Sequence, residues 1–496
     1  MSVAAEHMGK PIRAVIDIGS NSIRLVAFRA DRRTPFTLFN EKVMAGLGTG
    51  VAETGLMQDE NMQMGHDALS RFALLCADMQ VESIEAFATA AVREADNGPA
   101  FVEKVLAETG IDIRTIDGKQ EGKYAAMGVL AGIPEADGIV GDLGGGSLEL
   151  VRLRKGKPRE VLSLPIGSLK LAEARKGGTD KMRRLVKKAL NKVEWAVEGK
   201  DLPFYMVGGS WRALAQLQMH LTNYPLHIAH QYKLSTQAID RLARGVPNLR
   251  QKRMRSITNV STARTPHLPG AALLLRAVMK KLGSSHAIVS AYGIREGVFF
   301  EKLAPEIAAR DPLIAAARNE GEAQGRFPQH AGALMKWMSG LFPDEDKSES
   351  RLRRVAAELS DVAWRAHPEF RAERALETAL YGNWVGINAR ERALLAAALF
   401  ALYGGGVTEK KREALSRLAP FEELDRATGW GLALRLGQRL TGGTARPLGE
   451  SSLALVDDEI VLTLSTRCED LWSDSVERRL NALSAHMMRP AKMRIA

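Results

Sequence analysis

The pattern of apolar and polar positions divides the chain into two regions with different periodicities. In residues 12–300, short apolar runs such as "RAVIDIG" and "SIEAFATA" alternate with stretches of helical spacing such as "NMQMGHDALSRFALLCADMQ". Such alternation is typical of an α/β fold. After Lys302 the apolar residues recur mainly at helical spacing, as in "ARERALLAAALFALYGG" and "ESRLRRVAAELSDVAWRA". Near the end, "SLALVDDEIVLTL" alternates around Asp457 and Asp458 and predicts one hairpin.

The α/β region contains one pattern twice. "VIDIGSNSIRLV" and "VGDLGGGSLELV" each place an acid, a glycine turn with serine and a second apolar run in the same order, so that Asp17 aligns with Asp142. After the second hairpin, strand and helix patterns follow in the same order as they do after the first hairpin. We therefore predict an α/β domain at 12–134, a second copy at 135–304 and a mostly helical domain at 305–496.

The net charge of the chain indicates what kind of partner it binds, and its cysteine content indicates the cellular compartment. The net charge of +11 and the pI of about 9.6 favour a polyanionic partner. No apolar run approaches the roughly 18 residues that a membrane span needs. No aromatic residues interleave with the basic segments "KMRRLVKKALNK" and "RQKRMR", which makes nucleic acid a minor candidate.

Cys76 and Cys468 have no partner spacing, and the chain starts without an apolar signal segment, so we expect a cytoplasmic protein.

The duplicated hairpin suggests phosphate chemistry. A glycine turn between two strands directs several backbone N–H groups to one point, and such a nest binds phosphate oxygens. An acid just before the turn would repel a bare phosphate, but it suits a divalent cation held between the two. Each turn alone is better explained as a tight hairpin, because short glycine motifs are weak signals. Two copies in register favour a pair of turns that grip a phosphate chain from both sides of a cleft.

These stretches resemble the actin, sugar-kinase and heat-shock-chaperone superfamily, and within it the exopolyphosphatase and guanosine pentaphosphate phosphohydrolase family. The matching motifs are "DIGSNSIRL", "ATAAVREADNG", "IDGKQEGKYAAMGV", "GDLGGGSLELV", "LPIGSLKL", "VGGSWRALA" and "AYGIREGV". The resemblance implies duplicated actin-like (ribonuclease H-like) ATPase-type domains, followed by a degenerate HD-like helical domain. It also implies hydrolysis of the terminal phosphate of inorganic polyphosphate or of pppGpp, with Mg²⁺ or Mn²⁺, in a homodimer, with ppGpp as an inhibitor.

The same resemblance implies roles for individual residues. Glu121 corresponds to the general base, although an acid at a helix start is also favoured by the helix dipole. Asp142 and Glu149 are candidates for holding the metal or orienting the water, and Asp17 is a further metal candidate that alternatively only fixes its own hairpin. The "GGSW" turn either contacts substrate or only packs its helix. The phosphate-binding residues implied are Gly19, Ser20, Asn21, Ser22, Arg93, Gly144, Gly145, Gly146, Ser147, Gly208, Gly209 and Ser210.

The helical domain lacks the residues that an HD metal centre requires. In "AAELSDVAWRAHPEF", Ser360 stands before Asp361 where a histidine would be needed, and His367 is isolated. Serine is a poor replacement for a metal-binding imidazole. We therefore expect this domain to be structural or to bind polyanions.

Four functions follow from these patterns. The first is an exopolyphosphatase, and the second is a pppGpp phosphohydrolase that uses the same residues. An ATP-dependent kinase-like or chaperone-like protein would need a nucleoside pocket, which no stretch of the sequence indicates. A non-catalytic sensor of ppGpp is disfavoured because Glu121 is retained.

Overall fold

The computed structural model describes residues 11–29, 32–249, 254, 257, 260, 262–327, 329–406 and 409–496. The chain divides into two compact units, Met1–Arg310 and Asp311–Ala496. Within the described ranges, no helix combines the length and the apolar character needed to cross a bilayer.

The first unit contains two sheets. One has five strands in the order β3-β2-β1-β4-β5. Strand β1 pairs antiparallel with β2 and parallel with β4, and its central residues are buried. A continuous apolar run is expected for a strand that is covered on both faces. The bounds of the strands are β1 (Ile12–Ile18), β2 (Ile23–Arg29), β3 (Phe36–Val43), β4 (Ser83–Ala88) and β5 (Ile113–Thr115).

The second sheet repeats the arrangement of the first. Its order is β10-β11-β9-β6-β7-β8, and the part β8-β7-β6-β9-β11 has the same sequence of antiparallel and parallel pairings as the first sheet. The duplicated α/β unit that the two hairpins predicted is therefore confirmed, in the actin-like fold that the resemblance implied. Its strands are β6 (Gly138–Leu143), β7 (Leu148–Arg154), β8 (Lys157–Leu164), β9 (Pro203–Val207), β10 (Lys233–Ser235) and β11 (His286–Val289).

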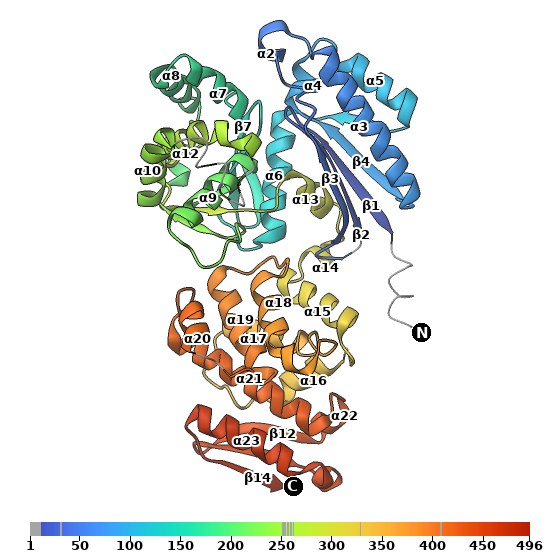
Figure 1. The fold of residues 1–496 in the computed structure, drawn as a ribbon, viewed down its shortest axis with the longest axis vertical. Coiled ribbons are helices and arrows are strands. Elements are labelled where there is room, and N and C mark those ends of the chain that lie inside the picture. The colour runs from blue at the N-terminus through green and yellow to red at the C-terminus, as the bar shows by residue number, and fades with distance from the viewer. Residues whose placement is uncertain are drawn as a thin grey trace. The chain divides into compact units, whose positions relative to one another are not determined.

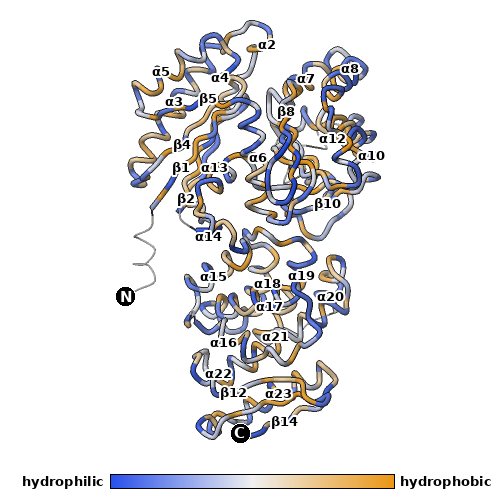
Figure 2. The backbone as a smooth tube through the Cα atoms, turned by 180° about the vertical axis from the view of Figure 1, so that it is seen from behind, coloured by the Kyte–Doolittle hydropathy of each residue, from blue (hydrophilic) through white to orange (hydrophobic). Residues whose placement is uncertain are grey.

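Helices cover both sheets of this unit (Figure 1). The strands are predominantly apolar, whereas α8 is strongly hydrophilic (Figure 2). Helices α6 and α13 run side by side between the sheets. The main helices are α3 (Asp59–Asp78), α4 (Ala90–Glu94), α5 (Gly98–Thr109), α6 (Gly118–Gly132), α7 (Ser168–Lys176), α8 (Thr179–Leu190), α9 (Gly209–Leu221), α10 (Thr236–Gly245), α12 (Leu268–Leu282) and α13 (Ile294–Glu301).

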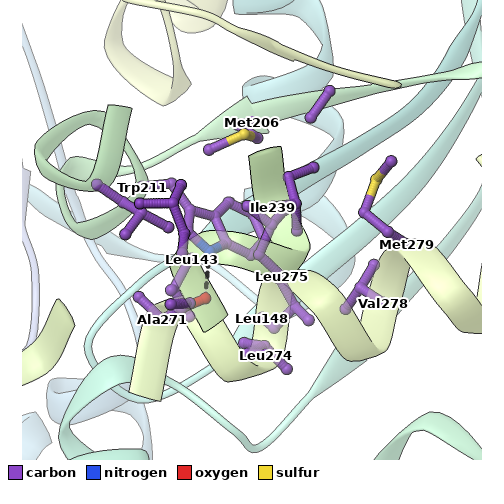
Figure 3. Close-up of a cluster of buried hydrophobic side chains, with 14 of the residues drawn as sticks. Leu143, Leu148, Met206, Trp211, Ile239, Ala271, Leu274, Leu275, Val278 and Met279 are labelled. Atoms are coloured by element: carbon purple, nitrogen blue, oxygen red, sulfur yellow. Dashed lines mark hydrogen bonds between the residues drawn. The ribbon is translucent and has the colours of Figure 1, made fainter. Parts of the chain in front are cut away.

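Trp211 anchors the start of α9 in the core of the second sheet (Figure 3). Its indole Nε1 donates a hydrogen bond to the Ala271 carbonyl oxygen over 3.1 Å, and its ring meets Phe204 edge-on with centroids 5.5 Å apart. A buried tryptophan whose N–H is satisfied contributes a large apolar area without a polar cost. The "GGSW" turn is thereby fixed in place against the sheet.

Two glycine contacts let α6 and α13 approach each other closely. A Cβ atom on Gly128 of α6 would overlap the Gly293 carbonyl oxygen, and one on Gly297 of α13 would overlap the Tyr124 carbonyl oxygen. Only glycine fits at such backbone approaches. The contact matters for function because α6 carries Glu121 and α13 carries Arg295.

The second unit is mostly helical and ends in a small sheet. The hairpin predicted over 452–464 is confirmed and begins at Ser451, and Asp457 and Asp458 both have positive φ, as a two-residue turn requires. The sequence analysis missed β14 (Ala491–Ile495), which pairs parallel with β13 (Glu459–Leu464) to complete the order β12-β13-β14. The other elements include α15 (Pro312–Gln324), α16 (His330–Trp337), α17 (Lys347–Glu358), α18 (Arg371–Tyr381), α19 (Ala389–Leu402), α20 (Glu409–Ser416), α21 (Phe421–Thr441), β12 (Ser451–Val456) and α23 (Asp474–Met487).

Asp361, the remaining acid of the degenerate HD pattern, is held by an arginine. Arg326 donates to both carboxylate oxygens of Asp361, with Nη2 2.7 Å from Oδ1 and Nε 3.2 Å from Oδ2. The Arg326 guanidinium also lies 3.6 Å from the ring centre of Trp364. Asp361 is therefore part of an ion pair in the folded unit.

Replacing Gly297 by alanine should destabilise the first unit. The new methyl group has to displace the Tyr124 carbonyl of α6, and overpacking of this kind costs about 1–3 kcal/mol. The urea midpoint of the full chain, followed by tryptophan fluorescence, should fall. Gly245→Ala is the matched control, because a Cβ on Gly245 meets nothing within 4 Å. Equal midpoints for the two variants would contradict the close helix contact.

Candidate active site

The two sheets of the first unit border a cavity of about 190 Å³. It lies at the carboxyl ends of β1, β4, β6 and β9, where the parallel strands of both sheets terminate. Ligands of open α/β sheets bind at this edge. Much of its polar lining comes from the turns after β1, β6 and β9 and from the first residues of α9 and α13, together with Glu121.

The turns after β1 and β6 have the same local geometry. The Gly19 N–H donates to the Ser22 carbonyl oxygen over 3.1 Å, and the Gly144 N–H donates to the Ser147 carbonyl oxygen over 3.0 Å. In the flanking strands, Asp17 stands opposite Arg24, and Asp142 stands opposite Glu149. The aligned acids and turns therefore occupy equivalent places in the two sheets.

The two turns meet each other, and both line the cavity. A Cβ atom on Gly145 would lie 3.1 Å from Ser20 Cβ, and one on Gly146 would lie 3.5 Å from Ser20 Oγ. The backbone N–H groups of Ser20, Asn21, Gly145 and Gly146 donate to no oxygen in the described part of the chain. Backbone donors that point at one place from two sides form a site for phosphate oxygens.

A third turn completes this donor set. Gly208 precedes α9 with φ of 102°, and a Cβ there would lie 3.1 Å from Asp142 Oδ1. Gly208, Gly209 and Ser210 all line the cavity. The N-terminus of the thirteen-residue α9 is thus directed at the cavity, where its partial positive charge favours an anion.

Glu121 projects from the first turn of α6, which Asp117 caps by accepting the Gln120 N–H over 2.7 Å. Glycines bring this turn close to β7, since a Cβ on Gly122 would lie 3.2 Å from Glu149 Cβ. Glu121 lines the cavity, although it is only 8% exposed, and its Oε2 has no partner in the described residues. The helix therefore presents a buried carboxyl with one unused oxygen.

Glu149 is buried on β7 next to Glu121, and it does not line the cavity. Its Oε1 accepts a hydrogen bond from Ser163 Oγ over 2.8 Å, and its Oε2 has no partner among the described residues. Burial raises the pKa of Glu121 well above its usual range, and the charge of Glu149 raises it further. Burial likewise raises the pKa of Glu149, and it raises that of Asp142 to about 7. The site concentrates carboxylates that are costly to ionise in the absence of a cation.

These carboxylates do not enclose a metal by themselves. In the described ranges, no three His, Cys, Asp or Glu side chains lie close enough together to hold an ion. Mg²⁺ commonly uses only one or two carboxylates, several waters and the phosphates of the substrate. One or two of the carboxylates of Asp142, Glu121 and Glu149 fit such an open site.

Five cationic side chains also line the cavity, and the sequence analysis assigned none of them to the site. They outnumber the three carboxylates that reach the wall, which are those of Asp17, Glu121 and Asp142. Three of the cations stand in motifs quoted above, whereas Lys42 and Arg264 carry no local signal. The five are Arg24, Lys42, Arg212, Arg264 and Arg295.

These cations repel one another. Burial lowers the pKa of Lys42 to about 8, and the charges of Arg264 and Arg24 contribute to the shift. Burial lowers the pKa of Arg212 to about 10, again with Arg295 and Arg264 contributing. A cavity that holds unneutralised positive charge is suited to a ligand with several negative charges.

Two of the predicted site residues have other contacts. Arg93 does not line the cavity, since its Nη1 donates to the Ile116 carbonyl oxygen over 2.8 Å. Asp17 Oδ2 lies 3.9 Å from Arg295 Nε, so this acid faces a cation. Of the two basic segments, the first forms most of α8, and only Met254 of "RQKRMR" belongs to the described residues.

The profile of the Ppx/GppA phosphatase family matches residues 25–306, which is more than half of the chain. The chain belongs to this family. The profile described as "Exopolyphosphatase, C-terminal" matches residues 313–448 of the second unit. The protein is therefore a member of a group of hydrolases that act on phosphoanhydride bonds.

Three relatives show the extent of the similarity. Retrograde regulation protein 2 of Saccharomyces cerevisiae is 26% identical over 451 residues, which cover 82% of this chain and 75% of that protein. The guanosine-5'-triphosphate,3'-diphosphate pyrophosphatase of Aliivibrio fischeri is 33% identical over 183 residues, or 36% of each chain. The crystal structure of an exopolyphosphatase from Cytophaga hutchinsonii is 25% identical and covers 59% of this chain and 99% of that one, with a TM-score of 0.54.

Removing the charge of Asp142 should change how stability depends on pH in EDTA. The pKa of Asp142 is raised from 3.8 to about 7, so between these values the folded state binds more protons than the unfolded state. Stability contributed by this group therefore falls as pH rises through that window, by about 1.4 kcal/mol for each pKa unit. Between pH 5 and pH 8, the melting temperature of Asp142→Asn should fall less than that of the wild type.

The control for this measurement is Asp59→Asn, which removes an exposed acid from the first turn of α3. It should leave the pH dependence of melting as in the wild type. A wild-type pH dependence in Asp142→Asn as well would show that Asp142 ionises without cost.

Proposed function

We propose that this protein is an exopolyphosphatase that releases terminal orthophosphate from inorganic polyphosphate and depends on Mg²⁺. The observation that carries the proposal is the pairing of two facing sets of unused backbone N–H donors with buried carboxyls and five cations in one cavity. Backbone N–H donors hold a phosphate chain, a carboxylate activates water beside it, and cations neutralise its remaining charges. The cavity brings all three together.

In this proposal the terminal phosphate lies in the cavity beside the place where the turns at Ser20 and Gly145 meet, with the N-terminus of α9 as a third donor. Glu121 accepts a proton from a water molecule as the water oxygen forms a bond to the terminal phosphorus. The bond from that phosphorus to the bridging oxygen breaks, and its electron pair stays with the shortened chain. The nearby charge of Glu149 raises the pKa of Glu121 and so favours its acceptance of the proton. The hydrogen bond from Ser163 fixes the orientation of Glu149.

Mg²⁺ would supply positive charge that favours the ionised carboxylates and draws phosphate oxygens towards them. Asp142 would hold it, with Glu149 and the substrate completing its surroundings. Asp17 is less suited to this role because it faces Arg295. Arg24, Lys42, Arg212 and Arg264 would neutralise the phosphates behind the reacting one.

The second candidate function is hydrolysis of the 5'-triphosphate of pppGpp at the same residues. The match to the Aliivibrio fischeri enzyme favours it, because that protein is named for a guanosine nucleotide. The lining of the cavity favours polyphosphate instead. No Phe, Tyr or Trp side chain stands among the lining residues within the described part of the chain, so an aromatic platform for a guanine base is missing there. The homodimer, the cytoplasmic location and inhibition by ppGpp stay predictions.

Glu121→Gln should lower kcat for long-chain polyphosphate by roughly 10²–10⁴, because an amide cannot accept the proton. Substrate affinity should remain near that of the wild type. The matched control is Glu60→Gln, which replaces an exposed acid in the first turn of α3 and tests whether Glu121 is only a helix-start acid. Near wild-type turnover in Glu121→Gln would remove this residue from the mechanism.

Phosphate release from long-chain polyphosphate, pppGpp and ATP should be compared at equal concentrations with Mg²⁺ and with EDTA. We expect kcat/KM to be highest for polyphosphate and every activity to be lost in EDTA. A higher kcat/KM for pppGpp would favour the second function. Full activity after EDTA treatment would overturn the metal role given to Asp142 and Glu149.

A further inference from the structure

The beginning of α7 is hydrogen-bonded to the glycine turn after β6. The N–H groups of Gly167, Ser168 and Leu169 donate to the three carbonyl oxygens of residues 144–146 over 2.9–3.0 Å. Gly167 can come this close because it has no side chain, since a Cβ there would overlap the Gly145 carbonyl oxygen. The motif "LPIGSLKL", to which the sequence analysis gave no role, therefore supplies three backbone donors to one turn.

These hydrogen bonds determine the direction in which the peptide groups of the turn face. In a trans peptide, the C=O and the next N–H lie in one plane and point in opposite directions. The Gly144 carbonyl oxygen points to α7, so the Gly145 N–H points away from α7. The same holds for the Gly145 carbonyl oxygen and the Gly146 N–H. Both of these N–H groups belong to residues that line the cavity, which leaves them to a ligand.

A turn of consecutive glycines depends on such bonds for its orientation. Glycine adopts both signs of φ, so a peptide group between two glycines can rotate by half a turn with little steric cost. The rotated peptide would direct its carbonyl oxygen towards the ligand, and the partial negative charge of that oxygen would repel a phosphate. The rotation also breaks the bond to α7 and leaves a donor without its partner, which is unfavourable. The beginning of α7 thus selects the orientation that binds an anion.

The turn after β1 is held in the same way by a different segment. The N–H groups of Gly46 and Gly48, which follow β3, donate to the carbonyl oxygens of Asn21 and Ser20 over 3.2 and 2.7 Å. A Cβ on Gly48 would lie 2.7 Å from Ser20 Cβ. The Asn21 N–H shares a peptide plane with the Ser20 carbonyl, so it points away from Gly48. In both copies, a glycine-containing segment after the third strand binds the carbonyl oxygens of the turn between the first two strands.

We propose that Gly167, Ser168 and Leu169 are positioning residues, whose backbone N–H groups keep the carbonyl oxygens of residues 144–146 turned away from the ligand and so direct the N–H groups of this turn at a phosphate. The segment 46–48 has the same role for the turn after β1. Donors that are already oriented need no reorganisation when the phosphate arrives, which favours both binding and turnover. The choice of a phosphate as the ligand rests on the proposed function.

The test variant is Ser168→Pro, which removes one of the three donors. Proline has no N–H, and its ring occupies the place of that hydrogen, so the Gly144 carbonyl has to turn away. Ser168 is the first residue of α7, and Gly167 before it is extended with ψ of 173°, so proline is compatible with the helix there. Ser168→Ala is the reference, because it loses the same hydroxyl and keeps the N–H.

The control for proline itself is Thr179→Pro. Thr179 is an exposed hydroxyl residue at the first position of α8 and also follows a glycine. Its N–H donates to no acceptor in the described part of the chain. Thr179→Pro therefore makes the same chemical change at a helix start that holds no turn.

Binding of inorganic tripolyphosphate with Mg²⁺ is measured by calorimetry, with Glu121→Gln in every protein so that the ligand is not consumed. We expect Ser168→Pro to bind about tenfold more weakly than Ser168→Ala, because the donors of the turn are no longer held in place. Thr179→Pro should bind as tightly as the parent. With Glu121 restored, Ser168→Pro should also lower kcat/KM for the hydrolysed substrate relative to Ser168→Ala.

Melting temperatures show whether each variant folds. If Ser168→Pro does not fold, Gly48→Ala tests the same role in the first copy, because its methyl group has to displace Ser20. Gly48→Ala should weaken the binding of tripolyphosphate. Gly245→Ala should not, since a Cβ on Gly245 meets nothing within 4 Å. Equal affinities of these two alanine variants would contradict the positioning role.

Three further results would overturn the proposal: equal affinities of Ser168→Pro and Ser168→Ala, an equal loss in Thr179→Pro, or no binding of tripolyphosphate by the parent. The outcome is distinguishable from failure of the proposed function. If the chain with Glu121 releases no phosphate from polyphosphate, but tripolyphosphate binding still differs between proline and alanine at position 168, the proposed hydrolysis fails while the positioning role stands.

Discussion

The close approach of α6 to β7 is the constraint on which the active site depends. Glycines on α6 allow Glu121 to come within reach of Glu149, and the second pair of glycine contacts fixes α6 against α13. This geometry places carboxyl groups in a buried position where their ionisation is unfavourable. The fold therefore maintains an unfavourable charge arrangement, which is common at sites where a cation and a polyanion are brought together.

The duplicated sheet explains how the rest of the cavity is assembled. Each copy contributes one strand–turn–strand element with the same hydrogen bond across its turn, and the two turns meet at Ser20 and Gly145. The copies have diverged at one informative place, since Arg24 stands where the other copy has Glu149. At this position the first copy places a cation on the cavity wall, whereas the second places a buried carboxyl that does not line the cavity.

The fold and the donor turns were predictable because their information is local. The acid, glycines and serine of each turn are adjacent in sequence, and the strands beside them have continuous apolar runs. The cationic wall was not predictable in the same way. Lys42 and Arg264 come from β3 and from the segment before α12, so only the folded chain brings them to Arg24. Strand β14 was missed because "AKMRI" is short and half polar, and its pairing with β13 depends on α23.

We propose above all that buried carboxyls at the base of the cavity hold a divalent cation. Calorimetric titration of Mg²⁺ into the metal-free protein at pH 7, repeated in buffers of different ionisation enthalpy, measures the protons released on binding. Because the pKa of Asp142 is about 7 and those of Glu121 and Glu149 are raised, binding at these groups must displace protons. We predict measurable proton release that is smaller in Asp142→Asn, because Glu121 and Glu149 remain. Binding without proton release, or no binding in the presence of polyphosphate, would contradict the account.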